Sequence, residues 1–108
     1  MADEDVQSID DLESLKPHYK TINIKVMKCG GLTPSLAILQ KAKAMHFNIM
    51  IGCMTESTVG ISAGIVLASF ADYLDLDGAN LIANDTFNGS KIVKGEVVLS
   101  ENAGLGIN

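Results

Sequence analysis

A lysine lies at the end of one apolar run in this sequence, shortly before a glycine pair. The run Ile22–Val26 reads Ile-Asn-Ile-Lys-Val, and the chain continues through Met-Lys-Cys to Gly30 and Gly31. β-Branched residues favour a strand, and the glycines favour a turn before the next element. A side chain at the carboxyl end of a parallel strand faces the region where α/β proteins bind ligands. We therefore take Lys25 as the first candidate for acid–base chemistry.

Lys25 has two competitors for this interpretation. A lysine at a strand end can simply extend its stem along the protein and place its ammonium group in solvent. Lys28 lies three residues further on, in the expected turn. We assign Lys28 a supporting role for the loop and keep Lys25 as the candidate catalytic residue.

Two aspartates show a second suggestive spacing, in Asp75-Leu76-Asp77-Gly78. Residues two apart on a strand face the same side, so both carboxylates can converge on one cation. The alternative is that both aspartates only form the turn before Gly78. The spacing therefore indicates either a cation-binding pair or a turn.

Composition limits the class of protein. The 108 residues allow at most one small domain, and an apolar fraction of 47% argues against disorder. A net charge of −5 without a basic patch makes nucleic acid and anionic membranes poor partners. No apolar run approaches the roughly 18–20 residues that span a bilayer, and no secretory signal is visible. Cys29 and Cys53 are expected to be reduced thiols, so we expect a cytoplasmic protein.

The elements that must position these side chains repeat along the chain. Strands are expected to start at three positions: Ile22, Phe47 and Tyr73. Each interval encloses one helix, the first with Thr33 as its predicted N-cap and the second over residues 58–70. A shorter helix precedes them, with Ser8 as its predicted N-cap. Repeated strand–helix units predict a parallel sheet, and helices with one apolar face favour the outer ring of a (β/α) barrel.

After Gly78 the pattern changes. Residues 81–83 are expected to be extended, a polar loop follows, and segments 92–94 and 96–99 are expected to form a β-hairpin around Gly95. The chain thus shows three to four β/α units, whereas a closed barrel needs eight in roughly 250 residues. An open half-barrel would expose two sheet edges. We expect either a piece of a longer chain, which we favour because Met1 lies in a strand pattern, or an oligomer.

The stretch Asn23–Gly31 resembles the sixth strand of an enolase-superfamily barrel of the muconate-lactonizing subgroup. Four other stretches agree in order: Met1–Glu4 with the fifth strand, Ile51–Ser57 with the seventh, Asp75–Gly78 with the eighth, and Gly104–Ile107 with the C-terminal tail. The resemblance implies that residues 1–108 form the C-terminal half of a TIM-type α/β barrel domain, without the capping domain and the first half. The strand-six and strand-eight motifs together resemble those of dipeptide epimerases, which interconvert L-Ala-L-Glu and L-Ala-D-Glu or related dipeptides.

The resemblance implies a proton transfer at the carbon next to a carboxylate. The enolase superfamily uses a lysine or histidine base, with Mg²⁺ stabilising the ene-diolate. Lys25 would be the acid/base of the sixth strand, opposite a second lysine that this sequence lacks. Asp3 would be one of three Mg²⁺ ligands.

The resemblance also implies how a dipeptide substrate is held. Asp75 and Asp77 would receive its ammonium group, and Cys53 and Thr55 would contact it largely through backbone groups. Three positions depart from the family pattern without removing a catalytic group: Asp5, Ala79 and Ala103.

Alternatives of two classes remain. Within the superfamily they are N-acylamino acid racemase/o-succinylbenzoate synthase and muconate cycloisomerase, although Asp75 and Asp77 favour a substrate with an amine. The other class is non-enzymatic, a half-barrel that self-associates into a homo-oligomer. We expect the 108-residue chain alone to be inactive, because one base and one metal ligand cannot complete the site.

Overall fold

The computed structural model describes residues 1–108 and contains two sheets. The first has three parallel strands in the order β1 (Thr21–Lys25), β2 (Asn48–Gly52) and β3 (Tyr73–Asp75). The second is an antiparallel hairpin of β4 (Lys91–Val93) and β5 (Glu96–Val98). The helices are α1 (Asp11–Leu15), α2 (Leu32–Ala44) and α3 (Thr58–Val66), with two 3₁₀ turns, η1 (Ala68–Phe70) and η2 (Gly78–Leu81). The predicted parallel α/β unit with a C-terminal hairpin is confirmed.

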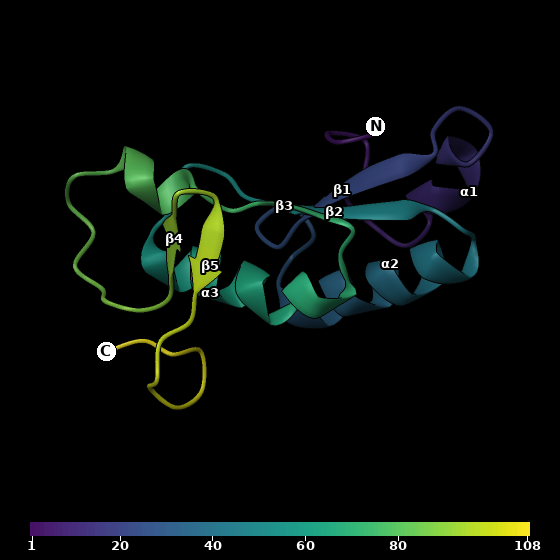
Figure 1. Cartoon of the computed structure of the whole chain (residues 1–108). Helices are drawn as coiled ribbons and strands as arrows, with labels where there is room; N and C mark the ends of the chain where they lie inside the picture. Colours follow the sequence, from purple (N-terminus) through teal and green to yellow (C-terminus); the bar gives the residue numbers. More distant parts are fainter.

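The parallel strands are joined through helices on one side of the sheet. α2 connects β1 to β2, and α3 connects β2 to β3. Figure 1 shows both helices below the three-stranded sheet, so its upper face carries no helix. Next to β1, Ala2 adds an isolated parallel bridge to Ile22. No helix is long and apolar enough to cross a membrane.

Successive residues of β1 and β2 belong alternately to the hydrophobic core and to the candidate site on the other face of the sheet. Ile22, Ile24, Ile49 and Ile51 are fully buried and belong to the hydrophobic core, together with residues of α2. Successive side chains of a strand point to opposite faces. The intervening residues of β1 and β2, Lys25 among them, therefore face the side of the sheet without helices.

Three local predictions are wrong. Ser8 does not cap α1 as an acceptor; instead the carboxylate of Asp11 accepts hydrogen bonds from the Ser8 backbone N–H (2.7 Å) and hydroxyl (3.1 Å). α2 begins one residue before Thr33, with Gly31 at its N-cap at φ 118°, a conformation that favours glycine. The predicted helix over 58–70 ends at Val66 and continues as a 3₁₀ turn.

The segment between η2 and the hairpin is anchored to α3 by one carboxylate. Asp85 Oδ2 accepts hydrogen bonds from the backbone N–H and the hydroxyl of Thr58, each at 2.6 Å, and Oδ1 accepts one from the Phe87 N–H. Hydrogen bonds from the Thr58 side chain and backbone lower the pKa of Asp85. Asp85 thus caps the N-terminus of α3 from outside the helix.

Candidate active site

The carboxyl ends of the three parallel strands place Lys25 and Asp75 on one row. The register pairs Lys25 with Gly52 and Gly52 with Asp75. Paired residues of parallel strands project to the same face, here the face without helices. Neighbouring strands lie about 4.8 Å apart, so the Cα atoms of Lys25 and Asp75 are roughly 10 Å apart. A small molecule that spans this distance can contact both side chains.

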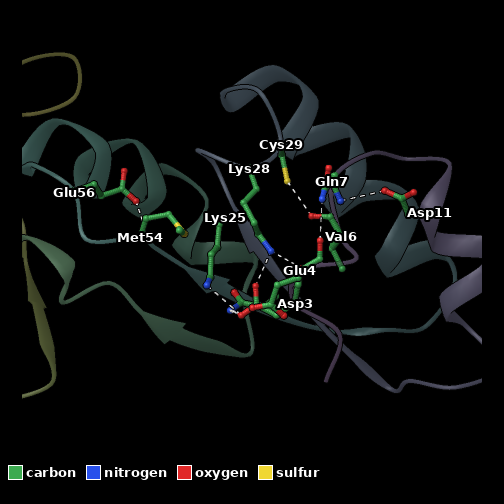
Figure 2. Close-up of polar contacts among 11 residues, drawn as sticks. Asp3, Glu4, Val6, Gln7, Asp11, Lys25, Lys28, Cys29, Met54 and Glu56 are labelled. Atoms are coloured by element: carbon green, nitrogen blue, oxygen red, sulfur yellow. Dashed lines mark hydrogen bonds and ion pairs between the residues drawn. The ribbon is translucent and has the colours of Figure 1, made fainter.

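Asp3 is held by three nitrogen donors. Lys25 Nζ lies 3.1 Å from Asp3 Oδ2, and Lys28 Nζ lies 2.6 Å from Oδ1. Lys28 Nζ also donates to the backbone carbonyl of Asp3, and Asn23 Nδ2 donates to Oδ2 at 3.0 Å. Figure 2 shows both lysine side chains extending toward Asp3. Burial raises the pKa of Asp3, but the hydrogen bonds from Lys28 and Lys25 outweigh it, so the pKa is lowered overall.

Asn23 lies beside this cluster because Gly52, the residue of β2 that pairs with Lys25, leaves room for its amide. A Cβ atom on Gly52 would lie 2.8 Å from Asn23 Nδ2 and still closer to Oδ1. A Cβ-bearing residue would therefore displace the amide. Asn23 is 3% exposed, and its Oδ1 has no hydrogen-bond partner.

The loop after β2 carries Cys53 and Thr55. Cys53 is half-buried, and burial raises the pKa of its thiol. Thr55 is exposed. Glu56 Oε1 accepts a hydrogen bond from the Met54 N–H at 2.9 Å, which folds the loop back on itself (Figure 2). Thr55 therefore lies exposed between the two residues that this hydrogen bond joins.

Asp75 ends β3 and Asp77 lies in the loop that follows, which packs against the loop after β2. Both aspartates are exposed, and neither carboxylate forms a hydrogen bond or ion pair. Gly78 is buried and packs closely on Met54. A Cβ atom at Gly78 would overlap the Met54 carbonyl oxygen and lie 3.0 Å from Cys53 Sγ. The structure thus brings Cys53 near the aspartate pair at the same end of the sheet.

Asp3 matches the ligand type that Mg²⁺ prefers, but it does not form a metal site alone. Carboxylate oxygens bind Mg²⁺ in octahedral geometry, usually with several waters. No group of three or more histidine, cysteine, aspartate or glutamate side chains comes together in the chain. The residues present can therefore contribute one Mg²⁺ ligand, Asp3, and do not form a complete metal centre.

Sequence reasoning missed Asn23 and Gly52, and it gave Lys28 only a general supporting role. The available signals were an asparagine in the middle of an otherwise apolar strand and a glycine ending the next strand. Lys28 in fact contacts Asp3 at two atoms.

Comparisons with known proteins place the whole chain in one group. The family model described as "Enolase C-terminal domain-like" matches residues 1–108. The L-Ala-D/L-amino acid epimerase of Maribacter sp. is 47% identical over 108 residues, covering 99% of this chain and 32% of that protein. The L-Ala-D/L-Glu epimerase of Bacteroides thetaiotaomicron is 40% identical over 106 residues, which cover 98% of this chain and 28% of that protein. The N-acetyl-D-glutamate racemase of Pseudoalteromonas sp. is 43% identical over 84 residues, covering 78% and 27%.

Solved structures agree with this result. The dipeptide epimerase from Methylococcus capsulatus, complexed with Mg and the dipeptide L-Arg-D-Lys, superimposes with a TM-score of 0.89 at 35% identity, covering 98% of this chain and 32% of that one. The substrate-liganded L-Ala-D/L-Glu epimerase from Bacillus subtilis gives a TM-score of 0.89 at 30% identity, covering 99% and 32%. The chain spans about a third of the length of these relatives.

Proposed function

The chain belongs to the enolase C-terminal domain-like family, and from this membership we propose that it supplies one side of the active site of a Mg²⁺-dependent dipeptide epimerase. Residues 1–108 would form the C-terminal half of its barrel domain. The proposal rests on one observation, the row Lys25–Gly52–Asp75 across the carboxyl ends of β1, β2 and β3. The row has a lysine at one end and an aspartate at the other, and a dipeptide needs a base near its α-carbon and an anion at its amine.

Lys25 is the proposed acid/base. Its neutral Nζ removes the proton next to the substrate carboxylate, and its ammonium form returns one. Epimerisation needs removal from one face and return on the other, so Lys25 serves one face only. The base for the opposite face would come from outside these 108 residues.

Asp3 is the proposed metal ligand of the chain. Mg²⁺, when bound, would offset the second negative charge that develops on the substrate carboxylate. Lys28 contacts one oxygen of the Asp3 carboxylate and Lys25 contacts the other. Asp3 thus links the proposed metal position to the proposed base.

Asp75 and Asp77 are proposed to bind the ammonium group of a dipeptide. Both carboxylates are exposed and unpaired, so they are available to a cationic ligand. Backbone groups at Cys53 and Thr55 would contact the rest of the substrate. A second candidate is racemisation of an N-acylated amino acid, which the similarity to the N-acetyl-D-glutamate racemase supports.

A chimera tests the epimerase proposal. Residues 1–108 replace the matching segment of the Maribacter sp. epimerase, and the conversion of L-Ala-L-Glu into L-Ala-D-Glu is followed by NMR. We expect epimerisation, and Lys25→Met should lower it about a hundredfold or more. Lys20→Met, a change at an exposed lysine before β1, is the matched control. A folded chimera that is inactive, or one that stays active with Lys25→Met, would contradict the proposal.

The same chimera distinguishes the two substrate classes. Replacing Asp75 and Asp77 together by Asn should reduce kcat/KM for L-Ala-L-Glu far more than for N-acetyl-glutamate, because only the dipeptide carries an ammonium group. An equal loss on both substrates would argue against the assignment of the aspartate pair.

A further inference from the structure

Asn23 is a buried polar residue that the proposed mechanism does not use. It lies in the middle of β1, between the core residues Ile22 and Ile24, and is 3% exposed. Its Nδ2 donates to Asp3 Oδ2. A carboxylate only accepts hydrogen bonds, so this contact fixes which end of the amide faces Asp3. The other end, Oδ1, is left buried without a partner.

Two features of the Asn23 position are unfavourable for folding. A buried acceptor without a hydrogen bond destabilises the folded state. The amide also needs Gly52 on the neighbouring strand, and glycine loses more conformational freedom on folding than any other residue. An apolar side chain at position 23 would avoid the unpaired oxygen. These two unfavourable features offset the stabilisation that the hydrogen bond from Asn23 to Asp3 contributes.

The arrangement does fix the Asp3 carboxylate. Lys25 and Lys28 both bind this group, one at each oxygen. Charge alone does not distinguish the two oxygens, and the segment around Asp3 joins β1 through a single bridge at Ala2. The Asn23 amide adds a directional contact at Oδ2, the oxygen that faces Lys25.

We propose that Asn23 is a positioning residue that holds the Asp3 side chain in a single rotamer, with its carboxylate between Lys25 and Lys28, at no net gain in fold stability. The inference rests on the proposed function, because the roles of Lys25 and Asp3 make this orientation useful. Gly52 acts with Asn23 by leaving the space that its amide occupies.

The test uses the 108-residue chain with Asn23→Leu and Gly52→Ala. Three-bond NMR couplings report the Asp3 χ1 rotamer, and thermal unfolding reports stability. We expect a single Asp3 rotamer in the wild type and averaged couplings in both variants. Asn23→Leu should leave the unfolding midpoint unchanged or raise it. Asn48→Leu, at an exposed asparagine on the same face of the sheet, should leave the Asp3 couplings unchanged.

Two results would overturn the proposal. One is an Asp3 rotamer that stays single in Asn23→Leu or in Gly52→Ala. The other is a clear fall in the midpoint of Asn23→Leu, or its failure to fold, which would make Asn23 a structural residue. Neither readout depends on turnover, so an inactive chimera would refute the epimerase proposal and leave this measurement intact.

Discussion

Replacing Asp3 by Asn removes the charge that two lysines share while keeping the shape of the side chain. A hydrogen bond to a charged group contributes about 1.5–3 kcal/mol when buried, and an exposed ion pair contributes below about 1 kcal/mol. The side chains of Lys25 and Lys28 are 16% exposed and that of Asp3 is 25% exposed, so these contacts lie between the two limits. We expect Asp3→Asn to lower the free energy of unfolding by about 2 kcal/mol at pH 7.

The pH dependence separates charge from shape. The folded-state pKa of Asp3 is lowered from its ordinary value of 3.8. A carboxyl group with a lowered pKa stabilises the fold fully above its unfolded value, and this contribution is lost as the pH falls through the folded value. The stability difference between wild type and Asp3→Asn should therefore be complete above about pH 5 and shrink toward zero below pH 3.8.

Urea unfolding of both proteins between pH 7 and pH 2.5 measures this difference. Asp5→Asn is the control, because Asp5 is an exposed aspartate without a side-chain contact, and it should change stability by less than about 0.5 kcal/mol. A difference that stays constant with pH would refute the electrostatic explanation. No difference at pH 7 would show that the two lysine contacts add nothing to stability.

Three further predictions concern the loops and thiols. Asp85→Ala should speed hydrogen exchange at the first turn of α3, because Thr58 loses both of its hydrogen bonds to the carboxylate; unchanged exchange would show that the cap is dispensable. Gly78→Ala should lower the free energy of unfolding by about 1–3 kcal/mol in urea titrations, since the added methyl group overlaps the Met54 carbonyl; a neutral effect would mean that the loops separate easily. Cys29 and Cys53 should react with iodoacetamide at pH 8 more slowly than free cysteine, because burial raises both thiol pKa values, and urea should remove the difference.

The order of strands and helices could be predicted because each element carries its own local pattern. The apolar runs before Gly52 and around Ile24 indicate strands without knowledge of their partners, and their spacing indicates parallel pairing. Lys25 could be singled out for the same reason, since it is the charged residue at a strand end. These inferences use neighbours in sequence only.

The contacts around Asp3 could not be predicted in this way. The fit of Asn23 over Gly52 depends on the register between two strands, which the sequence of neither strand specifies. The direction of Lys28 depends on the turn that follows it, where Gly30 adopts φ 84°. At the start of α1 the hydrogen-bond acceptor is the Asp11 carboxylate and not the predicted Ser8 hydroxyl. A carboxylate can accept several N–H and O–H donors at once.

The close packing of Gly78 on Met54 has a consequence for how substrate preference can change. The two loops that carry the proposed substrate contacts touch through backbone atoms, so a larger residue in one requires a shift in the other. Substitutions in the two loops should therefore be non-additive. Variants selected for a new dipeptide would need paired changes, one near Met54 and one near Gly78, and libraries that vary one loop alone would miss them.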